Sequence, residues 1–266
     1  MGEERFGEFV LVRRHGDGHV AELALDRPKA MNAVSTDMAR SLAAACTALG
    51  GDREVRVVVL TSTHERAFCV GADLKERNSF SDADLVRQRP VTRGAYTGVL
   101  ELPVPAIAAV HGFALGGGFE LALACDLIVA DRTAVVGLPE VSVGVIPGGG
   151  GTQLLPRRVG AARAAELIFT ARRVEAVEAR EWGLVDQLVE EGQDRAEALA
   201  LASRIAANSP VGLRAAKQAL RLGHGLDLRA GLEVEDAAWR SVAFSGDRAE
   251  GVAAFNEKRR PDWPGE

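Results

Sequence analysis

The stretch GFALGGGFELALACD, residues 112–126, places three consecutive glycines and a single acid, Glu120, before a run of small apolar residues. Residues 119–125 are apolar on nearly every side, so we expect a buried helix that begins at the glycines. Glycine lets the backbone approach a neighbour closely, and a helix N-terminus presents free N–H groups and partial positive charge. The stretch therefore predicts a preformed site for an oxyanion. The alternative is that Glu120 only complements the helix dipole.

Strand-like and helix-like segments alternate on both sides of this stretch. The first part of the chain predicts a hairpin of two strands, 8–14 and 19–25, around an HGDG turn. It also predicts buried strands over 55–61 and 104–110 and helices over 35–49 and 81–101. Short strands follow at LIVA and AVVGL. From residue 152 the pattern is helical, with candidate helices over 161–170, 175–181, 193–207, 210–222, 227–244 and 247–257. This order indicates an α/β core of about 200 residues followed by a helical C-terminal region.

The composition is that of an ordinary globular domain and excludes several classes of protein. The 266 residues are 47% hydrophobic and 26% charged, with a net charge of −5 and no block of like charges. Nucleic acid and anionic membrane surfaces are therefore not expected as partners. The three cysteines, Cys46, Cys69 and Cys125, form neither a CxxC pair nor a metal cluster. The N-terminus resembles no signal or transit peptide, and so we expect a cytoplasmic protein.

A second glycine-containing segment, AFCVGADLKE (67–76), follows the buried strand over 55–61. It is therefore expected near the C-terminal end of a strand, where α/β folds place their ligands. A turn of small residues also offers free N–H groups. The alternative is a plain strand-to-helix turn in which Asp73 caps the helix.

A third segment, GLPEVSVGVIPGGGGTQLLP (137–156), carries another lone acid, Glu140, in apolar surroundings. A buried carboxylate must be hydrogen-bonded, face a solvated cavity or have a raised pKa. The glycines at 148–151 again allow a close approach of the backbone before a possible helix from Thr152. The alternative is a tight loop with an exposed acid.

Other chemistries fit the sequence less well. The glycine run at 148–151 lacks the GK[ST] ending of a phosphate-binding loop, and the residues around Ser142 lack the first glycine of a GxSxG elbow. The five histidines are scattered without metal-ligand spacing. His111 is better explained as a structural histidine, and Cys69 as a small buried residue. What remains is a pair of acids and a pair of turns, which suit proton transfer beside an acyl group whose oxygen becomes an oxyanion.

At these residues the chain resembles the crotonase, or enoyl-CoA hydratase/isomerase, superfamily. The resemblance runs from DRPKAMNAV (26–34) through the three segments above to GVAAFNEKRRP (251–261). It implies an α/β fold, a crotonase (ClpP-like) spiral of ββα units over residues 1–200, with a helical C-terminal trimerisation region over 201–266. It also implies an acyl-CoA thioester substrate, no cofactor and no metal, and assembly as a homotrimer or a dimer of trimers.

The resemblance assigns roles to individual residues. The backbone N–H groups of Val70 and Gly117 would form the oxyanion hole, Glu120 and Glu140 would be the two acids, and the Gly148 N–H would help place the water. The segments expected to contact coenzyme A contain Lys29, Ala30, Ala67, Gly71, Ala72, Asp73 and Leu74.

The implied reaction is addition of water across the 2,3 double bond of a 2-enoyl-CoA, giving a 3-hydroxyacyl-CoA. The alternatives are a methylglutaconyl-CoA hydratase, an enoyl-CoA isomerase and, in a different class, a non-catalytic acyl-CoA-binding or RNA-binding protein. The absence of lysine from residues 38–56, the segment linked to RNA binding in a relative, argues against RNA.

Residues 77–100 are expected to line the acyl pocket, but the acyl chain cannot be read from them. Arg77, Arg87, Arg89 and Arg93 are candidates for pairing with a substrate carboxylate, and the alternative is a solvated helix face.

Overall fold

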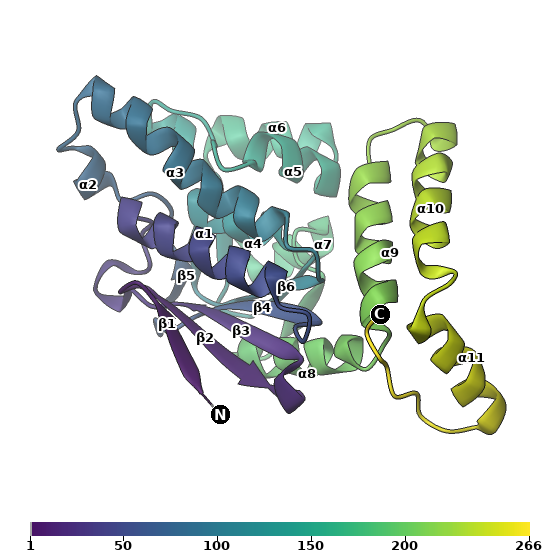
Figure 1. Ribbon diagram of the computed structural model, residues 1–266. Helices are drawn as coiled ribbons and strands as arrows, with labels where there is room; N and C mark the ends of the chain where they lie inside the picture. The colour runs from purple at the N-terminus through teal and green to yellow at the C-terminus, as the bar shows by residue number, and fades with distance from the viewer. Residues whose placement is uncertain (1) are drawn as a thin grey trace.

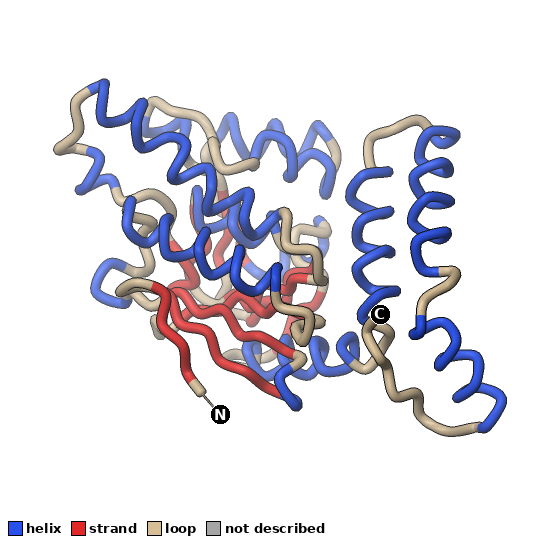
Figure 2. Tube along the Cα trace, viewed as in Figure 1, coloured by secondary structure: helices blue, strands red, loops and turns tan. Residues whose placement is uncertain are grey.

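The computed structural model describes residues 2–266 and contains two β-sheets with helices packed around them (Figures 1 and 2). The larger sheet has the strand order β1-β2-β3-β4-β6-β8-β11, and the smaller has the order β10-β9-β7-β5. The strands are β1 Glu3–Phe6, β2 Val10–His15, β3 Val20–Leu25, β4 Val57–Ser62, β5 Ala67–Cys69, β6 Ala106–Val110, β7 Phe113–Leu115, β8 Leu127–Asp131, β9 Val135–Gly137, β10 Val174–Glu175 and β11 Gln187–Val189.

Helices pack around these sheets and form a separate C-terminal arm (Figure 1). The helices are α1 Thr36–Gly51, α2 Leu74–Arg77, α3 Asp82–Leu100, α4 Gly117–Ala124, α5 Gly151–Val159, α6 Ala161–Thr170, α7 Ala176–Trp182, α8 Asp194–Ala206, α9 Pro210–Gly223, α10 Leu228–Val242 and α11 Gly246–Glu257. Both long N-terminal helices begin at serine caps. Ser35 accepts from the Met38 N–H, and Ser81 forms a capping box with Asp84.

The middle of the chain repeats one unit three times. A strand in the larger sheet (β4, β6, β8) is followed by a strand in the smaller sheet (β5, β7, β9) and then by helical chain. Within each sheet the successive strands of this series pair in parallel. The residues of β4 and β6 are nearly all buried, because helices cover both faces of the larger sheet. This confirms the predicted α/β spiral of ββα units.

Most predicted elements are present, and the differences concern short strands. The predicted helices from 161 to 257 are all found, and the predicted hairpin is β2 paired with β3. The prediction of an entirely helical region after residue 152 is wrong at β10 and β11. Each has two or three residues, and neighbouring strands β9 and β8 supply the backbone partners that their own sequences do not reveal.

The predicted division after residue 200 falls inside α8. The buried face of α8, which includes Ala198 and Ala202, packs on the larger sheet against Val57 and Ile107. The helical arm α9–α11 begins at Pro210, and in Figure 1 it stands beside the core. Side chains of α9 join the arm to the core. Lys217 donates to Val104 O, and Lys217 and Arg221 both pair with Asp126.

The smaller sheet brings the three motif segments together. Its strands β5, β7 and β9 are parallel neighbours, and Cys69, Leu115 and Gly137 are their last residues. Because the carboxyl ends of parallel strands meet at one edge of a sheet, the segments that follow them converge there. These segments begin at Val70, Gly116 and Leu138.

Candidate active site

A cavity of about 980 Å³ opens at this edge of the smaller sheet. Its walls come from the three convergent segments, from α2 and α3, and from the glycine loop before α5. Glu120, Glu140, Gly117 and Val70 all line it. The fold therefore brings the two predicted acids and both predicted oxyanion donors to one cavity.

Glu120 lies in the first turn of α4 and is 2% exposed. Its Oε1 accepts hydrogen bonds from the Gly149 and Gly151 N–H groups, both at 2.7 Å. Burial raises the pKa of Glu120, and these backbone N–H groups oppose the rise because they stabilise the ionised form. Glu120 is thus a buried carboxylate in the first turn of α4 that accepts two hydrogen bonds from the glycine loop, which the helix-dipole alternative does not include.

Glu140 is half-buried and follows β9 directly after Leu138 and Pro139. Its Oε2 atom is buried and makes no hydrogen bond within residues 2–266. Burial and, to a smaller extent, the negative charge of Glu120 together raise the pKa of Glu140 to about 7. A carboxyl group in this environment can carry a proton near neutral pH and release it to a bound molecule.

Gly116 shapes the backbone between these acids. It has φ +52° and ψ −128°, a conformation that side chains with a Cβ rarely adopt, and a Cβ there would lie 3.0 Å from Glu140 Oε1. The next residue, Gly117, begins α4. Its N–H makes no hydrogen bond within the described chain. Because it belongs to the N-terminus of α4, it lies where the helix dipole favours negative charge. The Gly117 N–H is therefore free to donate to a bound molecule, and its role as an oxyanion donor stays a prediction.

The second predicted donor is already engaged. The Val70 N–H donates to Met31 O at 3.2 Å, a long hydrogen bond. Val70 lines the cavity, but in this structure its N–H becomes an oxyanion donor only by sharing or exchanging that bond. The sequence segment NAV beside Met31 carried no signal of this contact.

The other predicted contact residues are divided between the cavity and its surroundings. Gly71, Ala72, Leu74 and Gly148 line the cavity. Lys29, Ala30, Ala67 and Asp73 are not part of its wall. Asp73 instead caps α2 and pairs with Arg27 at 2.7 Å, as the structural alternative for this residue predicts. Ala67 is fully buried in β5.

Tyr96 lies in the segment 77–100 that is expected to line the acyl pocket, but the sequence did not single it out. This single tyrosine of the chain lies on α3 and is 6% exposed. Its hydroxyl would lie 2.2 Å from a Cβ at Gly117, and its ring 2.6 Å from a Cβ at Gly149. Burial and the nearby charge of Glu120 raise the pKa of Tyr96. Its position at a buried point of a helical pattern was the only available signal.

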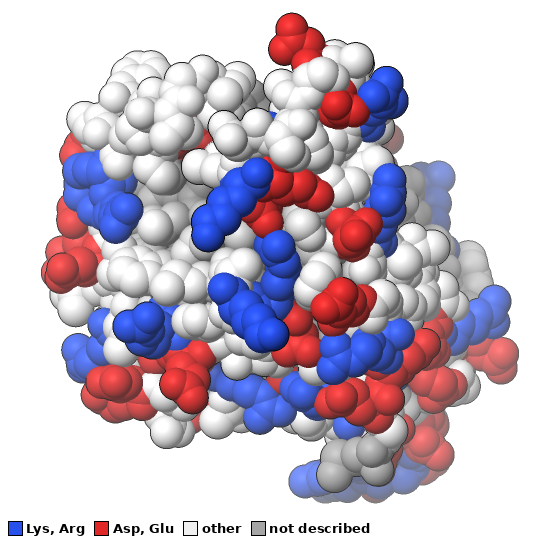
Figure 3. Space-filling model, turned by 90° about the vertical axis from the view of Figure 1, so that its left-hand side faces the viewer, with Lys and Arg blue, Asp and Glu red and all other residues white. Residues whose placement is uncertain are grey.

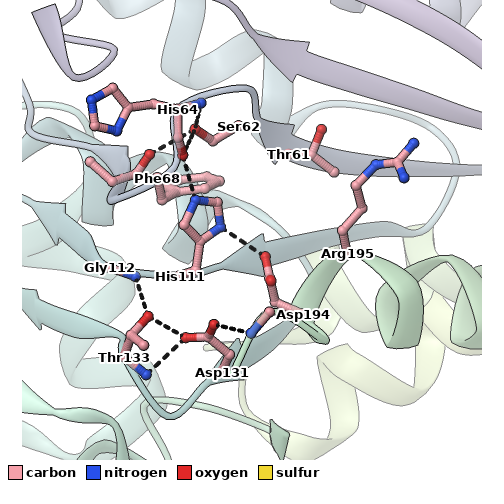
Figure 4. A network of polar contacts seen from close by, with 12 residues as sticks. Thr61, Ser62, His64, Phe68, His111, Gly112, Asp131, Thr133, Asp194 and Arg195 are labelled. Atoms are coloured by element: carbon pink, nitrogen blue, oxygen red, sulfur yellow. Dashed lines mark hydrogen bonds and ion pairs between the residues drawn. The ribbon is translucent and has the colours of Figure 1, made fainter. Parts of the chain in front are cut away.

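His111 anchors the chain between β6 and β7, directly before the glycine segment (Figure 4). One ring nitrogen, Nδ1, contacts Asp194 Oδ2 at 3.0 Å, and Nε2 contacts His64 O at 2.6 Å. Although burial opposes protonation, these two acceptors raise the pKa of His111. His111 is a hydrogen-bonded structural histidine, as expected.

Cys69 is fully buried, and its thiol donates to Asn32 O at 3.0 Å. Burial raises the pKa of this thiol to about 12, which excludes a thiolate nucleophile at neutral pH. Within residues 2–266 no cluster of three or more His, Cys, Asp or Glu side chains has the geometry of a metal site.

The surface drawn in Figure 3 carries intermixed charges. Lys and Arg side chains alternate with Asp and Glu side chains over its lower half, and much of its upper half is uncharged. This face lacks the continuous basic stripe that nucleic-acid binding requires. None of the helices in the described chain combines the length and apolar character needed to cross a membrane.

Known proteins share both the sequence and this architecture. The family model for enoyl-CoA hydratase/isomerase matches residues 15–266. The mouse mitochondrial enoyl-CoA hydratase domain-containing protein 2 is 43% identical over 250 residues, covering 92% of this chain and 84% of the relative. Human mitochondrial methylglutaconyl-CoA hydratase is 41% identical over 251 residues, covering 93% and 74% respectively.

A solved structure agrees with these relatives. The crystal structure of an enoyl-CoA hydratase from Bacillus anthracis superposes with a TM-score of 0.94 at 41% identity, covering 97% of this chain and 100% of that one. Taken with the sheet topology and the two-acid cavity, these matches show that the chain belongs to the enoyl-CoA hydratase/isomerase family, the crotonase superfamily.

Proposed function

We propose that the protein is a 2-enoyl-CoA hydratase that adds water across the 2,3 double bond and releases a 3-hydroxyacyl-CoA. The observation that carries the proposal is the presence of Glu120, Glu140 and the free Gly117 N–H at one cavity. A hydratase needs a base for water, an acid for C2 and a donor for the thioester oxygen, and these three groups supply them.

The ionised carboxylate of Glu120 accepts a proton from water while the water oxygen attacks C3. The π electrons of the double bond move toward C2 and the thioester oxygen, where the Gly117 N–H stabilises the enolate. Glu140 then delivers its proton to C2, and the proton on Glu120 passes through solvent to Glu140, which restores the ionised Glu120 and the protonated Glu140. One well-placed oxyanion donor contributes roughly 3–4 kcal/mol to such a transition state.

The structure supports this division of roles. Two N–H groups point at Glu120 Oε1, which favours its ionised form as a base. Glu140 lacks such donors on Oε2 and has a pKa raised to about 7, which favours a proton-bearing acid. Two acids at one cavity titrate as a coupled pair.

The test is incubation of the protein with crotonyl-CoA in H₂¹⁸O, followed by mass spectrometry of the thioester. A hydratase produces 3-hydroxybutyryl-CoA that carries one ¹⁸O atom. An isomerase leaves the mass unchanged and converts 3-enoyl-CoA into 2-enoyl-CoA, which a parallel reaction detects. Methylglutaconyl-CoA, the substrate class of the narrower hydratase alternative, is run in the same assay. Binding of these thioesters without any conversion would contradict the proposed function and favour a non-catalytic protein.

The proposal includes assembly as a homotrimer or a dimer of trimers. The arm α9–α11 exposes large apolar side chains, including Leu228 at 80%, Phe244 at 95% and Phe255 at 84%. A set of this kind on one arm suits burial by further copies of the chain. Sedimentation equilibrium should give a mass of three or six chains, and a monomer at micromolar concentration would contradict this part.

A further inference from the structure

The cavity wall carries more positive charge than the two-acid reaction uses. Four arginines line it, Arg77, Arg89, Arg93 and Arg173, and the only other charged side chains of the wall are the two glutamates. None of the four forms an ion pair within residues 2–266. Arg87, which shares α3 with Arg89 and Arg93, instead pairs with Asp84 at 2.6 Å. Three of the four arginine candidates from the sequence therefore face the cavity, and Arg87 does not.

Arg89 and Arg93 are one helical turn apart on α3, so their side chains share a face of that helix. Like charges at this spacing repel each other and destabilise the helix unless an anion lies between them. Arg89 uses one N–H, on Nη2, to donate to Gly148 O at 2.7 Å. A guanidinium has five such donors, so most of its hydrogen-bonding capacity remains for a ligand.

The glutamates of the cavity do not neutralise this pair. Glu120 is occupied by backbone N–H groups, and neither Glu120 nor Glu140 lies within ion-pair distance of an arginine in the described chain. An arginine close to Glu140 would lower its pKa, whereas the pKa of Glu140 is raised. The acids of the cavity thus leave the charge of the arginines unpaired within the described chain.

We propose that Arg89 and Arg93 bind a second carboxylate, carried by the acyl chain of the substrate, so that the preferred substrate is a carboxylated 2-enoyl-CoA. This inference rests on the proposed hydratase function and names its substrate class. Arginine suits the role because its planar fork matches the two oxygens of a carboxylate. Apolar residues of the same wall, such as Leu85 and Ile146, suit the carbon chain.

The phosphates of coenzyme A are the other possible anion. The segment expected to hold coenzyme A belongs to β5 and α2, whereas Arg89 contacts Gly148, in the loop that binds Glu120. Arg89 is therefore placed beside the reacting end of the site. Arg77 lies on α2, nearer the coenzyme A segment, and is not assigned to the acyl carboxylate.

Binding of unreactive thioesters tests the carboxylate site without requiring turnover. Glutaryl-CoA and pentanoyl-CoA have five-carbon acyl chains and identical phosphates, and differ in one terminal carboxylate. Isothermal titration of the full-length protein should show glutaryl-CoA binding at least about tenfold more tightly. Arg89→Gln and Arg93→Gln should each reduce this ratio several-fold. Arg87→Gln, the matched control on the same helix, should leave it unchanged.

Kinetics provide the second readout, as kcat/KM for glutaconyl-CoA against 2-pentenoyl-CoA. The same preference and the same loss in the Arg89 and Arg93 variants are expected, with folding checked by circular dichroism. An equal loss of affinity for both thioesters would show that the arginines bind coenzyme A and would overturn the inference. So would a wild-type preference for the uncharged chain. Tight binding of glutaryl-CoA without hydration of any enoyl-CoA would overturn the proposed function while supporting the carboxylate site.

Discussion

The Glu120 carboxylate and the Gly151 N–H are 31 residues apart in the sequence and 2.7 Å apart in the structure. This contact joins the helix after the first glycine segment to the loop of the third. Since Glu140 belongs to the third segment and lies between Glu120 and Gly151 in the chain, the same closure brings both acids to one cavity. The geometry of the candidate site thus depends on how closely the 148–151 loop approaches α4.

Replacing Gly149 with alanine should disrupt the site more than the fold. A Cβ at Gly149 would lie 2.8 Å from Glu120 Oε2 and 2.6 Å from the ring of Tyr96, so the loop must shift and the N–H bond to Glu120 is lost. We expect kcat/KM for hydration to fall by about two orders of magnitude. Gly94→Ala is the control, because a Cβ there meets nothing within 4 Å. Equal activity in both variants would contradict the role assigned to the loop.

Hydration should lose efficiency as the pH rises through about 7. The raised pKa of Glu140 means that it carries a proton below this value and loses it above, and the proposed mechanism needs that proton for C2. The profile of kcat/KM should also fall at acid pH, where Glu120 becomes protonated and cannot act as a base. A profile that rises steadily from pH 6 to pH 9 would argue against Glu140 as the acid.

His111 should contribute stability that depends on pH. Its folded-state pKa is raised above the ordinary value of 6.5 by Asp194 and by the carbonyl of His64, so its contribution is fully present below pH 6.5. That contribution is lost as the pH rises through the folded-state pKa. Urea unfolding of His111→Asn should show a deficit of about 1–3 kcal/mol at pH 6 that shrinks at higher pH. The exposed His224→Asn serves as the control, and a deficit that does not change with pH would contradict the account.

Tyr96 should matter through its ring more than through its hydroxyl. The ring fills the space between the two glycine segments, so Tyr96→Ala leaves a cavity and should destabilise the protein by about 3 kcal/mol. Tyr96→Phe keeps the ring and should retain most of the stability and activity. A loss of hydration in Tyr96→Phe without a loss of stability would instead assign the hydroxyl a direct part in the reaction. Thermal unfolding and crotonyl-CoA hydration on the same samples separate these outcomes.

The long elements and the two acids could be predicted because their signals are local. Composition, with Ser, Thr and Asp at the start and two glycines at the end, marks α1, and a β-branched apolar run marks β4. The short strands β10 and β11 are formed by partners elsewhere in the sheets, so no local pattern announces them. The same reason hides the Val70 contact with Met31 O and the packing of Tyr96, which depend on chain segments that meet only after folding.

Hydration of crotonyl-CoA by the wild-type protein, Glu120→Gln and Glu140→Gln is the most direct test of the two-acid account. The wild type should hydrate the substrate rapidly, and each variant should lose about two to four orders of magnitude in kcat, because each removes one proton-transfer group. Retained folding should be confirmed by circular dichroism. A glutamine variant that keeps activity close to that of the wild type would contradict the role of that acid, and activity retained in both would contradict the mechanism.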